Sequence, residues 1–525
     1  MKYVLSLVLN AHLPFVREYS KDNLAPGSTE ENWFFDALSE TYLPLLEVFE
    51  RLEQDNIPFS LGIAFSPLLG QMLRDDLLLK KYAVNLEHQI EFGNRETERL
   101  RSKPEMAGIA RYYLDRAGEK KARFERYGGN IFKAFNHFRQ KGTIEYLATP
   151  ATGAFLPLFT QFPESVQAQL EVAQSFYRYE MCSAPGGIWL PDLGWSIELD
   201  TAITAFGYDY TITDSHGFVF GNPEPSRGSF YPVKTPHNLS ILGRDFFACS
   251  EIQNLKKNKQ FRDNSRDISF ELPAEEIGNF LTKYGARCYT GFKYWQNRLE
   301  NTLYNPEIAI SLAKNSAEEY FTKCCGRLET VSGCMNEIPI SVIALDADDF
   351  GRHWYEGPYF LETIFRLAAQ TGTACFMTPS EYLGKQEKSA FEVSVPAYSS
   401  WGENGYAESW LDSKNDWIYR HLFHAAGRMV ELAERFSEDS GLKERALNQA
   451  ARELLLAQSS DWPKMLKRQQ HSYFANNQIE NALRNFTTIY EALGSSHIST
   501  EWLTSLEKHH NFFPAINYRV FRRKQ

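Results

Sequence analysis

The sequence predicts an α/β fold in which a (β/α) barrel is followed by an all-helical domain. Short apolar runs alternate with long helical patterns up to about residue 400, the apolar runs are unbroken, and the pattern after residue 401 is helical alone. Unbroken apolar strands that alternate with helices are typical of a parallel sheet buried on both faces. About seven such repeats favour a barrel over an open sheet.

Seven segments have the composition of buried strands, with β-branched and aromatic residues between turn residues. Long amphipathic patterns separate them, as in residues 30–55 and 108–141. The alternation of the two kinds of segment indicates repeated strand–helix units. The expected strands cover residues 3–9, 58–65, 143–148, 186–190, 208–214, 340–346 and 374–378.

The pattern divides the chain into two expected domains, a barrel over residues 1–400 and a helical domain over residues 401–525. Within the first, residues 196–243 are rich in Gly, Pro and Ser and do not read as a plain strand–helix unit. We expect them to form a long loop or a small inserted subdomain over the barrel rim, since loops of this length are often functional lids. Tyr231 lies in this segment, and its role is left open.

Composition narrows the class of protein. Lys and Arg number 56 and Asp and Glu 66, a net charge of −10, which disfavours nucleic acid and anionic membranes as partners. The seven cysteines are scattered and form no CxxC pair, as expected of a reduced, cytoplasmic protein. No apolar run reaches the roughly 18 residues of a membrane span. The sequence leaves the oligomeric state open.

Two carboxylates follow expected strands. In a parallel barrel the functional side chains lie at the carboxyl ends of the strands. Asp192 follows the strand of "GGIWLPDLGW", between Trp189 and Trp195, and Asp346 ends "ISVIALD". Two such carboxyl groups facing one cleft fit glycosidic chemistry, in which retaining enzymes hold them about 5–5.5 Å apart. The two flanking tryptophans fit cleft lining and core packing equally well.

Five ordered motifs extend this interpretation over nearly the whole chain. They are "NAHLPFVRE", "GTIEYLATPATGAFLPLF", "GGIWLPDLGW", "ALDADDFGRHWYEGPYFL" and "SSWGENGYAESWL", followed by "RALNQAARELLLAQSSDW" near the end. The chain resembles glycoside hydrolase family 57, in the branch of 1,4-α-glucan branching enzymes and AmyC-type α-amylases. The resemblance implies an incomplete (β/α)7 barrel, a small inserted segment and a helical C-terminal domain that closes over the cleft.

The same resemblance implies roles for named positions. Asp192 stands at the nucleophile position, and Asp346 at that of the general acid/base. No cofactor or metal is expected, and the implied partner is an α-glucan or maltooligosaccharide. The substrate-binding positions implied by the motifs, the strand ends and the first helix are Asn10, His12, Trp33, Arg244, Arg352, His353, Trp354, Trp401, Glu403, Trp410 and Asp461.

Four departures from the family pattern cluster at the expected site. Asn10 and Gly153 stand where the family has His, Asp192 stands for its Glu, and Arg352 stands for another His. A shorter carboxylate is a weaker nucleophile unless the backbone approaches, and Arg352 beside either acid would lower its pKa. His353 is a candidate replacement for the imidazole lost at Arg352.

Two functions therefore remain open at this point. One is an α-glucan hydrolase or transglycosylase, and the other is an impaired relative that binds glucan without catalysis. A third class, the polysaccharide deacetylases, uses a similar barrel with a metal held by Asp and two His. The chain offers only His12 at a strand end and no HxxxH pair, which disfavours that class.

Overall fold

The structure is a computed structural model that describes residues 3–19, 28–297, 301–495 and 497–524. It confirms the α/β fold with a helical C-terminal part, and a strand overlaps each of the seven expected strand segments, with the first extending two residues further, to Ala11. The strands are β1 (Tyr3–Ala11), β2 (Leu61–Phe65), β3 (Ile144–Tyr146), β4 (Gly187–Ile188), β5 (Tyr210–Thr213), β6 (Val233–Lys234), β7 (Ser240–Gly243), β8 (Ile340–Asp346), β9 (Ala374–Phe376) and β10 (Glu392–Val393).

The strands form two sheets with mostly parallel pairing. One has the order β3-β2-β1-β8, with β9 pairing β1, and the other has the order β10-β6-β7-β5-β4. Two parallel bridges connect the sheets, Ala148 with Ile188 and Arg244 with Val342. In the first sheet Asn10 is the register partner of Asp346, so both side chains project from the same level of the sheet.

The segment 196–243 is more regular than the sequence indicates. It holds β5 and β7, which pair in parallel over four residues, and the short antiparallel strand β6. The sequence pattern predicts β5 but not β7. Its four residues "SILG" follow a stretch rich in turn residues, too short to show a strand pattern.

Side chains alternate between two hydrophobic cores along the strands. On β1, Val4 and Val8 join a smaller core that also draws residues from β2, β5, β7 and β8. Leu5, Leu7 and Leu9 face the larger core, which extends among the surrounding helices. A strand reverses its side-chain direction at each residue, so this parity fixes where polar residues at the strand ends point.

Helices surround the strands and begin at recognisable signals. Asp75 caps α4 by accepting a hydrogen bond from the Leu78 amide, and Asn305 caps α12 before a proline. A π-helical turn, Leu38–Tyr42, joins α1 to α2. The helices of this part are α1 (Glu31–Ala37), α2 (Leu43–Gln54), α3 (Pro67–Met72), α4 (Asp76–Arg99), α5 (Pro104–Arg126), α6 (Ile131–Gln140), α7 (Pro163–Tyr179), α8 (Glu198–Ala205), α9 (Ser215–Val219), α10 (Phe246–Leu255), α11 (Ala274–Ile277), α12 (Pro306–Ser332), α13 (Gly357–Thr371) and α14 (Pro379–Gly384).

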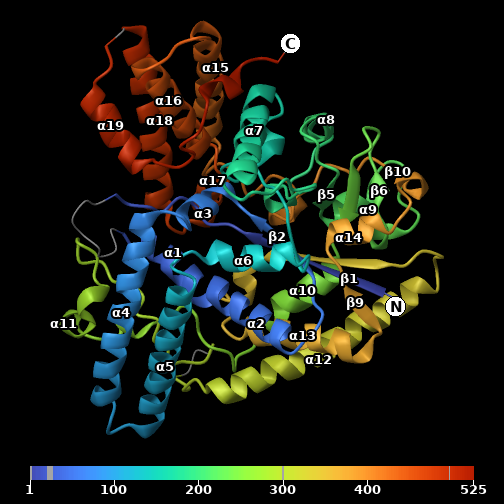
Figure 1. Ribbon diagram of the computed structural model, residues 1–525, viewed down its shortest axis with the longest axis vertical. Helices are drawn as coiled ribbons and strands as arrows, with labels where there is room; N and C mark the ends of the chain where they lie inside the picture. Colours follow the sequence, from blue (N-terminus) through green and yellow to red (C-terminus); the bar gives the residue numbers. More distant parts are fainter. Residues whose placement is uncertain (1–2, 20–27, 298–300, 496, 525) are drawn as a thin grey trace.

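The C-terminal helices gather at one end of the molecule, at the top of Figure 1. They are α15 (Trp417–Arg435), α16 (Leu442–Ala457), α17 (Asp461–Arg468), α18 (Ser472–Gly494) and α19 (Thr500–His509). The central helix α16 is buried along most of its length and packs against α15 and α18. The short α17 lies between this group and the strands, as Figure 1 shows, which brings its side chains toward the strand ends.

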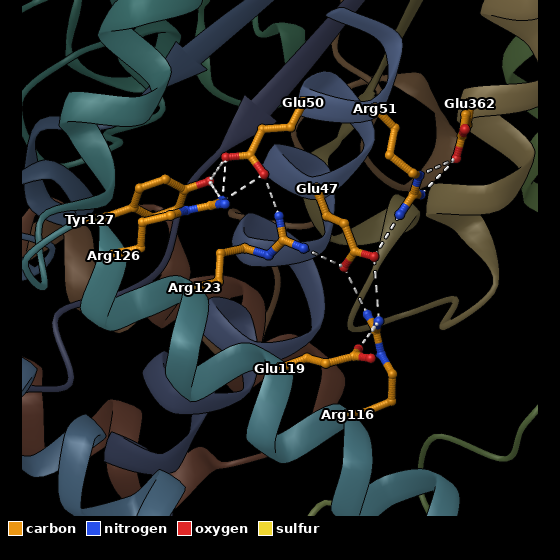
Figure 2. A network of polar contacts seen from close by, with 9 residues as sticks. All are labelled: Glu47, Glu50, Arg51, Arg116, Glu119, Arg123, Arg126, Tyr127 and Glu362. Atoms are coloured by element: carbon orange, nitrogen blue, oxygen red, sulfur yellow. Dashed lines mark hydrogen bonds and ion pairs between the residues drawn. The ribbon is translucent and has the colours of Figure 1, made fainter. Parts of the chain in front are cut away.

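A network of ion pairs joins α2 to α5 (Figure 2). Glu47 of α2 accepts from Arg116 at 3.0 Å, and Glu50 accepts from Arg123 and from Arg126. Arg51 extends the network to Glu362 of α13 at 2.6 Å. The side chains of Glu47 and Glu50 are about four-fifths buried. The network therefore fixes the long α4–α5 hairpin, which projects at the lower left of Figure 1, to the strand-bearing part.

Candidate active site

The alternation of side chains along the strands directs four polar side chains to one opening at the strand ends, here called the strand mouth. Asn10 continues the series Val4 and Val8 on β1, and Asp346 continues Val342 and Ala344 on β8. By the same rule Asp214 follows Tyr210 and Ile212 beyond β5, and Arg244 follows Leu242 beyond β7. An Arg244 guanidinium nitrogen lies 3.3 Å from a carboxylate oxygen of Asp214, so these strand ends meet in space.

Two adjoining cavities open at this mouth, with volumes of about 260 and 540 Å³. Asp192, Asp346, Lys464 and Arg468 line both, so the two acids lie where the cavities meet. The first cavity also includes Asn10, His12, Thr149, Gly153, Asp348, Arg352, His353, Asp461 and His471 in its wall. The second includes Arg244, Gln253, Asp349, Trp401, Glu403, Ser409, Trp410 and Lys467.

Asp346 is poised to hold a proton. Burial and the neighbouring Asp349 carboxylate raise the pKa of Asp346 to about 6, and Asp192 raises it further, against the lowering effects of Asn10 and Lys464. The Asn10 amide donates a hydrogen bond of 2.8 Å to Asp346 Oδ1. A carboxyl group whose pKa lies near neutrality is suited to general acid/base catalysis.

Asp192 is held from two sides. The Trp401 indole donates to Asp192 Oδ1 at 2.7 Å, and the Lys464 ammonium donates to Oδ1 and Oδ2 at 2.9 and 3.1 Å. The backbone at Asp192 is in the left-handed region, with φ 54° and ψ 26°, and Leu193 follows at φ 51°. Such conformations cost about 1–3 kcal/mol in a non-glycine residue and are typical of functional sites.

His12 is anchored by the helical part of the chain. Its Nε2 lies 2.8 Å from Asp461 Oδ2, which also accepts from the Ser459 hydroxyl. Burial lowers the pKa of His12, but the Asp461 carboxylate outweighs it and the pKa is raised. Gly153, at φ 68°, lies against this ring, and a Cβ there would stand 3.0 Å from His12 Cε1. The glycine therefore makes room for the imidazole.

Arg352 pairs with a third acid, Asp348, rather than with Asp192 or Asp346. Its guanidinium pairs with Asp348 at 2.5 Å, and Asp348 also accepts from Thr41 of the π-helical turn. Asp346 keeps a raised pKa of about 6, chiefly through burial and Asp349, although Arg352 lines the same cavity. The lowering expected if Arg352 lay beside Asp346 is therefore not the net outcome, and the guanidinium pairs with Asp348 instead.

The other polar positions surround the acids. His353 lies 3.8 Å from Asp349, which Lys256 and Gln253 also contact. The Arg244 guanidinium lies 5.2 Å from the Trp401 ring centre, where it stacks as a cation over an aromatic face. Glu403 stands exposed beside Lys467 at 3.4 Å.

Several aromatic expectations need correction. Trp354 packs among Phe261, Phe350 and Phe360 and is 1% exposed, so it serves the core rather than substrate. Trp410 borders the second cavity, but it is fully buried and stacks on Phe155 with ring centres 3.8 Å apart. A ring covered in this way offers no open face to a sugar.

Trp33 stands behind the rim, with its ring 4.6 Å from that of His471, which lines the first cavity. Tyr231 is 3% exposed and packs against Phe391 and Arg227, so it is not a lid residue at an open loop tip. Trp189 and Trp195 are both fully buried, which decides for packing over cleft lining. Each of these rings contacts a residue distant in sequence.

Lys464, Asp348, Asp349 and Arg468 also line the cavities, although the sequence pattern assigns them no role. Lys464 had one available signal: it follows Asp461 by three residues on α17, so both project from nearly the same helix face. Among the residues with assigned positions, no group of three or more His, Cys, Asp or Glu side chains is arranged to hold a metal ion. The same described parts contain no helix long and apolar enough to cross a membrane.

The fold and the site define a class. An α/β scaffold with two carboxyl groups in one cleft, one of them with a raised pKa, fits the two-carboxylate arrangement of enzymes that act on glycosidic bonds. Comparison then fixes the family. Residues 6–396 match glycosyl hydrolase family 57, and residues 421–521 match the C-terminal region of 1,4-alpha-glucan branching enzymes. The chain belongs to glycosyl hydrolase family 57.

Similar proteins cover between 93% and 100% of the chain. The alpha-amylase AmyC from Thermotoga maritima is 32% identical, with a TM-score of 0.92 and 100% of both chains covered. A GH57-type branching enzyme from Pyrococcus horikoshii is 23% identical with a TM-score of 0.89, covering 100% of this chain and 98% of its own. The 1,4-alpha-glucan branching enzyme of Thermococcus kodakarensis is 25% identical over 93% of this chain and 73% of its own.

Proposed function

We propose that this protein acts on α-1,4-glucan as a branching-enzyme-like glycoside hydrolase or transglycosylase, with Asp346 as the general acid/base and Asp192 as the nucleophile. The relatives named as branching enzymes and as an alpha-amylase support the substrate class. The observation that carries the assignment of roles is the contrast between the acids. Asp346 has a pKa raised to about 6, whereas Asp192 is paired with an ammonium group.

The proposed reaction proceeds in two steps. Asp346 protonates the glycosidic oxygen as its bond to the anomeric carbon breaks, while an Asp192 oxygen bonds to that carbon. Asp346, now ionised, then takes a proton from the acceptor hydroxyl, whose oxygen displaces Asp192. Water as acceptor gives hydrolysis, and a sugar hydroxyl gives transfer. The two cavities flanking the acids provide room for glucan on both sides of the cleaved bond.

The proposal includes a finer architecture. We take the two sheets to form one incomplete (β/α)7 barrel, supported by the bridges Ala148–Ile188 and Arg244–Val342. The proposed domains are residues 1–400, with the insertion at about 196–243, and the helical residues 401–525. A cytoplasmic location is proposed from the cysteines, all seven of which lie in described parts of the chain as free thiols.

The non-catalytic alternative rests on the four changed positions alone, and the comparisons do not favour it. Three of those positions have a structural account: Asn10 bonds Asp346, Gly153 accommodates His12, and Arg352 pairs with Asp348. The fourth, Asp192, keeps a carboxylate in the cleft.

Two substrates test the proposal. Amylose reports overall turnover through new reducing ends and new branch points. An aryl α-maltoside with an acidic phenol leaving group needs little protonation in the first step. Asp346→Asn should therefore abolish turnover of amylose yet still release the phenol, whereas Asp192→Asn should lose both activities. Asp439→Asn removes a carboxylate from the helical part, outside the cavities, and serves as the control.

If both variants turned amylose over at the wild-type rate, the proposed roles of Asp346 and Asp192 would be overturned. Maltooligosaccharide binding without any turnover by the wild-type protein would instead establish the non-catalytic alternative.

A further inference from the structure

The contact between Lys464 and Asp192 joins two parts of the chain that are 272 residues apart. Lys464 lies on α17, and its ammonium donates to both Asp192 oxygens. The side chains are 22% and 11% exposed, so the pair is largely withdrawn from water. Asp461 in the first turn of the same helix accepts from His12. One short helix thus holds two side chains of the strand mouth.

The pair restricts the Asp192 carboxylate strongly. Its two oxygens face the ammonium, and Trp401 Nε1 fixes Oδ1 from a second direction. A carboxylate that is bonded on two sides has little rotational freedom about its last bond. Burial lowers the pKa of Lys464, but Asp192 and Asp461 outweigh it and the pKa is raised, so the ammonium remains charged.

The ammonium also fills the space next to the short side chain. With 2.9 and 3.1 Å between Lys464 Nζ and the two oxygens, an added methylene at position 192 would push the carboxylate into the lysine. The effects of substitutions at positions 192 and 464 should therefore be coupled, because a longer acid at position 192 needs a smaller or displaced side chain at position 464.

We propose that Lys464 is a positioning residue for Asp192, which sets the direction of its carboxylate in the cleft and makes the site depend on α17. This inference rests on the proposed function of Asp192. Lys464 acts through its direct contact with Asp192 and on the charge balance of the cleft, since its charge lowers the pKa of Asp346, Asp461 and His12.

The experiment compares Lys464→Met, which keeps the length and removes the charge, with Lys464→Arg, which keeps the charge. Lys443→Met removes an exposed lysine from α16 and is the matched control. Misplacement of a reacting group by about 1 Å costs on the order of 10²-fold in rate. Lys464→Met should therefore lower kcat by about that factor with little change in KM, Lys464→Arg should recover part of the loss, and Lys443→Met should match the wild type.

The pH profile separates positioning from general structural damage. Burial, Asp349 and Asp192 raise the pKa of Asp346, whereas Asn10 and the charge of Lys464 lower it. Without that charge the basic limb of kcat/KM should move to higher pH in Lys464→Met and stay in place in Lys464→Arg. A structural defect alone would reduce the amount of active enzyme without moving the limb.

A titration without turnover keeps this inference distinct from the proposed function. Carbon-13 NMR of labelled aspartate carboxyls follows Asp346 in the wild type, Lys464→Met and Lys464→Arg, whether or not the protein cleaves glucan. A raised Asp346 pKa in Lys464→Met alone supports the contact as described. Wild-type kcat and an unmoved titration in Lys464→Met would overturn the inference, whereas an inactive wild type with that same Asp346 shift would overturn the proposed function only.

Discussion

The Asn10 amide donates a hydrogen bond of 2.8 Å to Asp346, its register partner on the neighbouring strand. The bond stabilises the ionised carboxylate, so it is one of the forces that keep the Asp346 pKa from rising further above about 6. Strand register alone creates this contact. It needs no loop to be ordered and no second domain to dock.

Replacement of Asn10 by leucine removes the donor and keeps a similar side-chain volume. We expect the pKa of Asp346 to rise, so the basic limb of kcat/KM should move to higher pH. The measurement is the pH profile of maltooligosaccharide turnover. An Asn10→Leu profile that coincides with the wild type would show that the amide contributes nothing to the titration.

Substitution of Asp349 should shift the pKa of Asp346 in the opposite direction. Its carboxylate raises the pKa of Asp346, and Lys256 pairs with it at 2.5 Å. Asp349→Asn removes a negative charge and leaves the lysine charge unpaired, so the Asp346 pKa should fall and the basic limb should move to lower pH. Glu251→Gln removes a surface carboxylate from α10, which ends just before Lys256. Glu251 pairs with Lys323, and its substitution should leave the profile unchanged.

Asp192→Glu tests reach and crowding together. Because Lys464 occupies the space beside the carboxylate, the single substitution should give little gain in kcat, and Asp192→Glu/Lys464→Met should exceed Lys464→Met by about tenfold or more. Rates of amylose turnover for the four proteins complete a double-mutant cycle. A large gain from Asp192→Glu alone would show that the lysine leaves room for the longer acid.

Gly153 and Gly142 form a matched pair. Both have positive φ, 68° and 80°, but a Cβ at Gly153 would contact His12 whereas nothing lies within 4 Å of one at Gly142. Alanine at either position should cost about 1–2 kcal/mol of unfolding free energy through the backbone. Only Gly153→Ala should also lower turnover, since it displaces the imidazole. Thermal denaturation and amylose assays give the two readouts, and equal activities would deny the contact any role.

The Glu47 network in Figure 2 sets an acid limit on stability. Burial raises the pKa of Glu47, but hydrogen bonds and charge from Arg116, Arg123 and Arg51 outweigh it, and the pKa is lowered. A lowered folded pKa contributes stability above the ordinary value of 4.5, which is lost as the pH falls through the folded value.

Glu47→Gln should therefore reduce the unfolding free energy by about 1–2 kcal/mol at pH 7 and by less at pH 3. Urea denaturation at the two pH values measures the difference. Glu98→Gln, at an exposed pair with Arg101, is the control and should change little. An equal effect of Glu47→Gln at both pH values would contradict the charge argument.

The strands with long apolar runs could be predicted from sequence because the length and composition of these runs are typical of buried strands rather than of helices or loops. Asp346 and Asn10 followed from the same reasoning, since a residue at the end of a buried parallel strand has few places to point. Strand β7 could not, because four residues carry no periodic signal.

Side chains whose partners lie far along the chain were the ones missed. Tryptophans such as Trp410 and Trp354 are residues of the type that stacks on sugars. Only the structure shows that Trp410 packs on Phe155 and Trp354 on Phe261. Lys464 depends in the same way on Asp192, an acid 272 residues away that a pattern of spacing does not link to it. Pairing of charges across a cleft is decided by tertiary geometry.

The alternation of β8 between two cores limits insertions and deletions more than substitutions. Val342 and Ala344 face one core and Ile343 and Leu345 the other, and Asp346 inherits its direction from that count. A single codon gained or lost between Ile340 and Asp346 would rotate the acid out of the cleft and bring Leu345 or Ala347 in its place. Variants that change the length of this segment should therefore be far less tolerated than variants that exchange one aliphatic residue for another.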